Sequence, residues 1–188
     1  LTEQQKNALD VLFPLLDTDE PRAALLRGVT GSGKTRVILE CVKHTLAAGR
    51  TAIVLIPEIG LTAQAVSQYR AAFGENLAVI HSMLSDGERA DAYRAARAGD
   101  VGVVLGTRSA VFAPLENLGL IAIDEEQEHT YKSEMTPRYH ARDIARFRCG
   151  RDGALMLLAS ATPSVESYYK AKKGVYTLVE MDRRATEV

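Results

Sequence analysis

Cysteine is scarce in this chain of 188 residues, which holds only Cys41 and Cys149. Neither lies in a CxxC pattern or in a Cys/His spacing, so the sequence offers no ligand set for zinc and no framework of disulfides. Both fall in helix-like stretches, where we expect them to be small buried side chains. This cysteine usage is typical of a reducing compartment, and we expect a cytoplasmic protein.

Long apolar runs and a dominant charge are also missing. No stretch approaches the roughly 18 apolar residues of a membrane span, and the N-terminus lacks a charged-then-apolar signal pattern, so we expect neither export nor a membrane partner. The 23 basic and 24 acidic residues give a formal net charge of −1. A site for a polyanion must therefore be built locally by particular residues.

Short apolar runs rich in β-branched residues alternate with longer helix-like stretches along the chain. This alternation predicts one α/β domain with a mostly parallel sheet and helices on both faces. The expected strands are residues 23–27, 51–56, 77–81, 101–106, 118–123, 155–159 and 176–179. The expected helices are residues 4–16, 34–48, 62–73, 85–98, 141–149 and 163–173. Residues 126–140 form a polar, aromatic-containing segment that is too long for an ordinary connection, and such loops are usually functional.

Residues 28–35 read GVTGSGKT and fit the phosphate-loop pattern GxxxxGKS/T between an apolar strand and a helix. Glycines let backbone N–H groups surround phosphate oxygens, Lys34 brings a positive charge to the β- and γ-phosphates, and the Thr35 hydroxyl can bind Mg²⁺. The alternative is a glycine-rich turn without a ligand. We predict a P-loop NTPase whose nucleotide-binding residues here are Gly28, Thr30, Gly31, Ser32, Gly33, Lys34 and Thr35.

Two carboxylates, Asp124 and Glu125, follow the apolar strand 118–123. Ligands bind at the carboxyl ends of strands in open α/β sheets. Behind a phosphate loop, we expect Asp124 to hold Mg²⁺ and Glu125 to polarise the attacking water, so that Lys34, Asp124 and Glu125 are the catalytic residues. Taken alone, such a pair is equally compatible with a solvated turn.

Ser160 and Thr162 follow another apolar strand, in the run Ser160-Ala161-Thr162-Pro163. This run also fits a helix N-cap followed by proline, and taken alone it favours that interpretation. Its position as a third polar strand end, after the phosphate loop and the acidic pair, favours a functional role.

Five segments together resemble motifs I, Ia, Ib, II and III of superfamily 2 helicases. They are GVTGSGKT (28–35), PEIGLT (57–62), GTRSA (106–110), DEEQ (124–127) and SATPS (160–164). The wording of PEIGLT and GTRSA, the NLGL run (117–120) and the run YHARD (139–143) are similar to the PriA-type family of bacterial primosomal helicases. The resemblance implies a RecA-like lobe that binds ATP and Mg²⁺ over residues 1–180. It also implies that residues 181–188 begin a linker to a second RecA-like lobe of the same parent chain.

The resemblance assigns further residues. The opening LTEQQ resembles the family's glutamine motif, with Gln5 at the position that reads the adenine edge. Gln127 stands where the family's DEEH box has histidine; glutamine keeps hydrogen-bonding capacity but cannot take a proton, which leaves its coupling role open. In relatives this position relays the nucleotide state towards motif III, which assigns coupling to Gln127, Ser160 and Thr162.

Nucleic-acid contacts are implied at two segments. Thr107, Arg108 and Ser109 follow a strand, and hydroxyls and backbone amides can grip phosphates without net charge; a plain polar loop is the alternative. The segment with Tyr131, Lys132 and Tyr139 corresponds to the family's aromatic-rich loop, where bases can stack on rings. Its alternative is a surface loop whose tyrosines cover the edge of the core.

The function implied is the motor lobe of an ATP-dependent DNA helicase that remodels stalled forks for primosome assembly and replication restart. Its expected partners are single-stranded or forked DNA, single-strand-binding protein and primosome proteins, with no zinc in this fragment. Another superfamily 2 helicase or translocase and a non-motor phosphate-loop ATPase are the alternatives. A GTPase should carry an Asn-Lys-x-Asp reader, which the sequence lacks, and a non-catalytic switch should lack Glu125. Because arginine fingers come from the second lobe, the isolated domain should hydrolyse ATP weakly.

Overall fold

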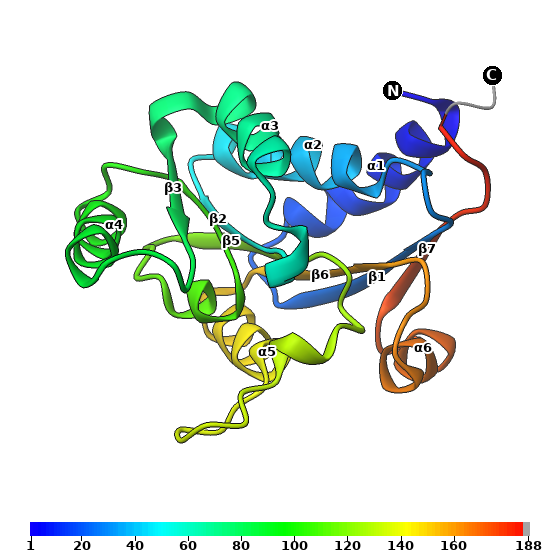
Figure 1. The fold of residues 1–188 in the computed structure, drawn as a ribbon. Helices are drawn as coiled ribbons and strands as arrows, with labels where there is room; N and C mark the ends of the chain where they lie inside the picture. The colour runs from blue at the N-terminus through cyan, green and yellow to red at the C-terminus, as the bar shows by residue number, and fades with distance from the viewer. Residues whose placement is uncertain (186–188) are drawn as a thin grey trace.

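Seven parallel strands form one sheet in the computed structural model, which describes residues 1–185 (Figure 1). The strand order is β3-β4-β2-β5-β6-β1-β7, and every pairing is parallel. The strands are β1 (Arg22–Gly28), β2 (Thr51–Leu55), β3 (Leu77–Ile80), β4 (Val103–Gly106), β5 (Leu118–Ile123), β6 (Leu155–Ser160) and β7 (Thr177–Met181). All carboxyl ends therefore meet at one edge of the sheet, and the predicted parallel sheet is confirmed.

Helices cover both faces of this sheet, as predicted (Figure 1). The helices are α1 (Glu3–Leu16), α2 (Lys34–Ala47), α3 (Ala63–Phe73), α4 (Asp86–Ala98), α5 (Ala141–Asp152) and α6 (Val165–Lys172). Side chains of α1, α2 and α3 form one apolar core with the sheet, and side chains of α4, α5 and α6 form a second core on the opposite face. The interiors of β2, β4, β5 and β6 are buried on both sides, which explains the continuous apolar runs in the sequence.

Cys41 and Cys149 lie one in each core and are both buried, as expected from the sequence. Burial raises the pKa of each thiol to about 12, so both stay protonated at neutral pH. A protonated, enclosed thiol behaves as a small apolar side chain. No described helix has the length and hydropathy needed to cross a bilayer.

Element ends agree with the predicted ones to within three residues, and β5 matches at both ends. Helix α5 continues to Asp152 and ends at Gly153, whose left-handed φ of 64° forms the C-cap. Strand β7 continues to Met181, because Met181 pairs with Gly28 at the entrance to the phosphate loop. The described part of the predicted linker, 181–185, begins with Met181 of β7 and returns to that loop, where the Ala185 amide donates to the Gly31 carbonyl at 2.9 Å. The rest of that linker, residues 186–188, lies outside the described residues.

Two left-handed glycines, Gly153 and Gly174, give a matched test of backbone crowding. A Cβ on Gly153 would overlap the carbonyl oxygen of Asp19, whereas a Cβ on Gly174 would have nothing within 4 Å. We expect Gly174→Ala to lower the free energy of unfolding by about 1 kcal/mol, from the left-handed backbone alone. We expect Gly153→Ala to lower it by about 3 kcal/mol, because the overlap adds to that strain. Urea denaturation measures both, and equal losses would contradict the clash.

Candidate nucleotide site

The phosphate loop connects β1 to α2 and is shaped by close contacts. Gly31 and Gly33 adopt left-handed φ values of 82° and 85°. A Cβ on Gly28 would come within 2.5 Å of the Ser32 hydroxyl, and one on Gly33 would overlap the Gln5 amide. Gly31 and Gly33 therefore meet a conformational requirement of the loop, and Gly28 and Gly33 leave room for the Ser32 and Gln5 side chains.

Lys34 and Ser32 bring polar groups to the inside of this loop. Lys34 is 7% exposed, and its Nζ donates to the Gly28 carbonyl at 2.9 Å across the loop. The Ser32 hydroxyl is buried and has no hydrogen-bond partner among residues 1–185. A buried hydroxyl without a partner is costly, and an oxyanion would satisfy it.

Gln5 is buried against the phosphate loop at the start of α1. Its Oε1 accepts from the Thr2 amide at 2.9 Å, and its Nε2 lies 3.3 Å from the Ser32 carbonyl. Thr2 in turn caps the helix, so Thr2 and Gln5 form a capping box. Sequence reasoning missed this box, although Thr-x-x-Gln before a helix is its known signature. Gln5 thus ties α1 to the loop, and its adenine-reading role stays a prediction.

Asp124 and Glu125 emerge from β5 beside the phosphate loop. The Asp124 amide donates to Leu55 at the end of β2, and the Glu125 amide donates to the Asp124 carboxylate, both at 2.9 Å. Both acids line a cavity of about 280 Å³ together with Thr35. Burial, and then the charge of Glu125, raises the pKa of Asp124 to about 6. A cation in this cavity would therefore stabilise a carboxylate that the fold leaves poorly solvated.

Gln127 joins Glu125 to Ser160 and Thr162. Its Nε2 donates to the Glu125 carboxylate at 3.0 Å, and its Oε1 accepts from the Ser160 hydroxyl. Ser160 also accepts from the Thr162 amide at 2.9 Å. The structure thus brings together the three residues to which a coupling role was assigned. Because an amide donates with one atom and accepts with the other, glutamine makes this bridge without a proton exchange.

The residues predicted to contact nucleic acid range from buried to exposed. The Thr107 side chain is buried, and its amide donates to the Ile80 carbonyl. The guanidinium of Arg108 donates to the carbonyls of Thr130 and Lys132 at 3.1 and 3.0 Å and lies 5.8 Å from the Tyr139 ring. Arg108 therefore joins the segment after β4 to the aromatic loop, which we define as residues 128–140. The carbonyl of Ser109, which is half-buried, is 3.4 Å from the Tyr93 hydroxyl.

Tyr131 does not have the exposed ring that base stacking requires. Its side chain is 1% exposed, and its hydroxyl donates to the Asp124 carbonyl and lies 3.2 Å from that of Leu55. The base-stacking prediction is therefore wrong for Tyr131 in this structure, because apolar packing encloses both ring faces. The alternative, a tyrosine at the edge of the core, applies to this residue. Lys132, by contrast, is exposed. Tyr139 is partly buried and packs edge-on against Phe112 with ring centroids 5.0 Å apart.

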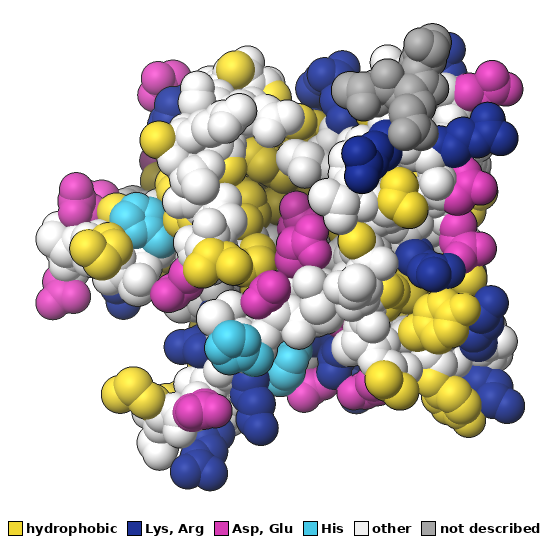
Figure 2. Space-filling view, turned by 45° about the vertical axis from the view of Figure 1, so that its right-hand side comes forward, with side chains coloured by type: hydrophobic (Ala, Val, Ile, Leu, Met, Phe, Trp, Pro, Cys, Tyr) yellow, Lys and Arg dark blue, Asp and Glu magenta, His cyan; other side chains and the backbone are white. Residues whose placement is uncertain are grey.

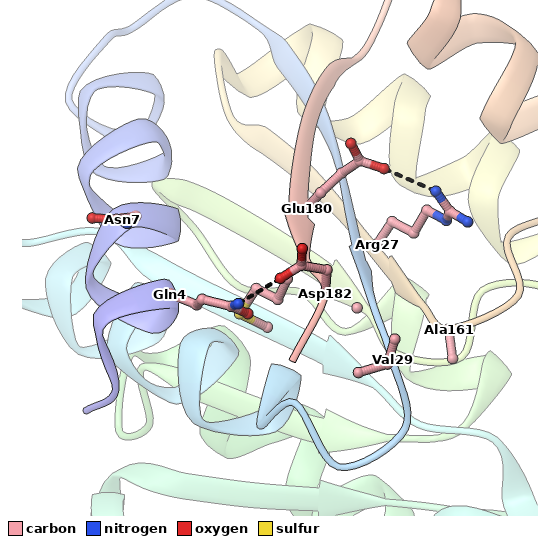
Figure 3. A pocket seen from close by; sticks show the side chains of 9 residues that line it. Gln4, Asn7, Arg27, Val29, Ala161, Glu180 and Asp182 are labelled. Atoms are coloured by element: carbon pink, nitrogen blue, oxygen red, sulfur yellow. Dashed lines mark hydrogen bonds and ion pairs between the residues drawn. The ribbon is translucent and has the colours of Figure 1, made fainter. Parts of the chain in front are cut away.

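A second hollow, of about 330 Å³, lies between α1, the start of the phosphate loop and the end of β7 (Figure 3). Two polar pairs border it: Gln4 donates to Asp182 at 2.6 Å, and Arg27 contacts Glu180 at 2.9 Å. None of the predicted catalytic side chains lines this hollow. On the face shown in Figure 2, basic and acidic side chains are interspersed, in keeping with the net charge of −1.

Comparison with known proteins identifies the family of this chain. The sequence profile of the DEAD/DEAH box helicases matches residues 2–171. The chain belongs to the DEAD/DEAH box helicase family. Replication restart protein PriA of Bacillus subtilis is 48% identical to it over 184 residues, which are 98% of this chain and 23% of that protein. PriA of Chlamydia pneumoniae is 44% identical over 186 residues, 98% of this chain and 25% of that protein.

The resemblance to PriA proteins predicted from the motifs is thus confirmed, and the chain spans about a quarter of the length of these curated relatives. Among solved structures, RecG bound to a three-way DNA junction is 25% identical with a TM-score of 0.71, and the match covers 100% of this chain and 25% of that one. The helicase MrfA bound to DNA and AMPPNP is 18% identical with a TM-score of 0.67, covering 98% and 27%. These likenesses confirm the RecA-like fold.

Membership of the DEAD/DEAH box helicases implies the use of ATP and Mg²⁺, and the residues present fit both. The unpartnered Ser32 hydroxyl and the buried Lys34 suit phosphate oxygens. Thr35 and Asp124, which line one cavity, would hold Mg²⁺ with hard oxygen ligands. Bound there, the cation would neutralise charge that develops on the phosphates.

Sequence reasoning missed two buried charged residues in this helicase lobe. Glu126, inside the acidic turn that we define as residues 124–127, is 2% exposed and contacts Arg142 of α5. Arg148, also on α5, donates to the carbonyls of Val111 and Ala113 at 2.7 and 2.8 Å. No sequence signal separates these arginines from the exposed ones of the same helix, because a charge pattern does not reveal which carbonyls lie opposite.

The raised pKa of Asp124 predicts that its ionised form destabilises the folded protein when no metal is bound. Its folded pKa of about 6 exceeds the usual 3.8, so this destabilisation is absent below about pH 4 and is complete once the pH is well above 6. We expect Asp124→Asn to raise the free energy of unfolding in EDTA by on the order of 2 kcal/mol at pH 8, and by much less at pH 4.5. Asp91→Asn, at an exposed site, is the control. Denaturation curves in which Asp124→Asn is no more stabilising at pH 8 than at pH 4.5 would contradict this assignment.

Proposed function

We propose that this chain is the ATP-binding motor lobe of an ATP-dependent DNA helicase that remodels stalled replication forks for primosome assembly and replication restart. One observation carries the proposal: Thr35, Asp124 and Glu125 line a single cavity beside the phosphate loop, in a chain 48% identical to a replication restart protein. Support for a DNA partner comes from RecG and MrfA, whose structures hold DNA.

The residues have distinct roles in this proposal. Gly28, Thr30, Gly31, Ser32, Gly33 and Lys34 bind the phosphates, Gln5 reads the adenine, and Thr35 and Asp124 bind the cation. Glu125 accepts a proton from water as the water oxygen attacks the γ-phosphorus; the bond from the γ-phosphorus to the bridging oxygen breaks, and ADP leaves. The hydrogen-bond chain from Glu125 through Gln127 to Ser160 and Thr162 supports a coupling role for these residues.

DNA contacts are proposed for Thr107, Arg108, Ser109, Lys132 and Tyr139, and no longer for Tyr131. Arg108 lies over Tyr139 and holds the backbone of the aromatic loop, so a strand that displaces either one would disturb the other. The remaining partners are a second RecA-like lobe after a linker that begins near residue 181, single-strand-binding protein and primosome proteins. The isolated lobe should turn over ATP weakly, because a second lobe supplies arginine fingers.

The proposal is tested by measuring ATP turnover by the full-length protein at fixed salt. The reaction is run without nucleic acid and with single-stranded DNA, forked DNA or single-stranded RNA. Stimulation by forked DNA above all others supports the fork-remodelling motor. Equal stimulation by single-stranded DNA, forked DNA and single-stranded RNA favours another superfamily 2 translocase. Turnover that no nucleic acid changes favours a non-motor ATPase.

A further inference from the structure

Glu126 is the member of the acidic turn that points away from the nucleotide cavity. Asp124, Glu125 and Glu128 line that cavity, and Glu126 does not. Its side chain is 1% exposed, yet its carboxylate is fully hydrogen-bonded. Oε1 accepts from the Ser164 amide at 2.7 Å, and Oε2 lies 3.2 Å from the Ser164 hydroxyl and 3.0 Å from the Ser167 hydroxyl. A buried carboxylate is tolerated only with such partners, so the folded state requires these hydrogen bonds to Ser164 and Ser167.

Arg142 completes the enclosure of this carboxylate. Its side chain is 12% exposed, and its guanidinium lies 3.3 Å from Glu126 and 2.8 Å from Glu166. Glu166 is half-exposed and also pairs with Lys170 at 2.6 Å. The cluster thus holds two carboxylates and two cations in balance. Only the Glu126 end of it is buried and attached to the acidic turn.

The turn itself depends on anchors at both sides of Glu125. Before it, the Asp124 amide donates to Leu55 of β2; after it, the Glu126 amide donates to Ala159 of β6 at 3.1 Å. Between these anchors Glu125 adopts a φ of 46°, the left-handed region that a residue with a Cβ disfavours. A disfavoured conformation persists only where its surroundings hold it, and the Glu126 side chain adds a restraint on the far side to the one that its amide provides.

We infer that Glu126 is a positioning residue for hydrolysis: its buried carboxylate, held by Arg142, Ser164 and Ser167, fixes the turn that aims Glu125 at the attacking water. The same contact attaches the first turn of α6, and therefore the segment 160–164, to the acidic turn. This inference rests on the proposed ATP hydrolysis.

The test compares Glu126→Gln with Glu166→Gln in the full-length protein. Both changes remove one carboxylate next to Arg142, but only Glu126 is buried against the turn. We expect Glu126→Gln to lower kcat by about 10²-fold with KM for ATP within about threefold, because a misdirected base affects the chemical step more than binding. Glu166→Gln should keep kcat within about twofold.

Two further variants separate positioning from folding. Ser167→Ala removes one donor and keeps the charges, and it should lower kcat by about threefold to tenfold while the melting temperature falls by only a few degrees. The double variant Glu126→Gln/Arg142→Gln replaces the ion pair by two amides that can bond each other, and it should recover about tenfold of the lost kcat. Such rescue would not follow from loss of fold.

Three results would overturn the inference. One is a kcat for Glu126→Gln within twofold of wild type. Another is a parallel loss of kcat, ATP affinity and melting temperature in Glu126→Gln without any effect of Ser167→Ala, which would make the contact purely structural. The third is an absence of ATP turnover by the wild-type protein with every nucleic acid. That result would contradict the proposed function, on which this inference rests.

Discussion

Replacing Glu125 by glutamine is expected to slow ATP turnover by about 10³-fold while ATP affinity stays within about threefold of wild type. Glutamine keeps the size of the side chain and can still bond Gln127, but it cannot accept the proton of the attacking water. The Glu125 carboxylate lines the same cavity as Thr35 and Asp124, and because Asp124 is assigned to the cation, Glu125 is the proposed base. Steady-state turnover and binding of a fluorescent ATP analogue measure the two quantities separately.

Glu128→Gln is the matched control for this change. Glu128 also lines the cavity, but it follows the acidic turn and has no assigned role in proton transfer. Its substitution should leave turnover within about threefold, because only the charge near the site changes. Turnover of Glu125→Gln equal to wild type, or a loss shared by both variants, would rule out Glu125 as the base.

Replacing Tyr131 by alanine is expected to lower the free energy of unfolding by about 3–5 kcal/mol, the usual cost of removing a buried aromatic ring. Tyr131→Phe should cost about 1–2 kcal/mol, because it leaves the Asp124 carbonyl without the donating hydroxyl. Chemical denaturation of the 188-residue chain measures both losses. The position of the hydroxyl predicts that even the phenylalanine variant loosens the acidic turn.

Tyr169→Ala is the surface control, since Tyr169 is 61% exposed. It should change stability by less than about 0.5 kcal/mol. A Tyr131→Ala protein that is as stable as wild type but binds single-stranded DNA more weakly would restore the base-stacking role that the structure argues against.

Local patterns in the sequence were sufficient for the fold. All seven strands and six helices were predicted, because strands buried on both faces leave continuous apolar runs, and glycines and caps mark where helices begin and end. The phosphate loop and the acidic pair were found for a related reason: their chemistry requires particular residues at fixed short spacings. Such signals are contained within a few neighbouring residues.

Tertiary structure alone decided which polar side chains face inward. Tyr131, expected at the surface, is enclosed, and Arg108, expected to face DNA, holds two carbonyls of the aromatic loop. The turn aims Glu126 at the start of α6, away from the cavity that Asp124 and Glu125 line.

The sequence by itself thus determined the parallel sheet, the phosphate loop and the family, since each depends on short-range pattern. Only the folded chain decided the connections between Glu125, Gln127 and Ser160 and between Glu126 and Arg142. The Gln127–Ser160 contact joins residues 33 positions apart and forms only once the carboxyl ends of β5 and β6 lie side by side. The Glu126–Arg142 contact joins residues 16 positions apart and forms only once α5 packs beside the acidic turn. The spacing of residues along the sequence does not predict which of these distant side chains come into contact.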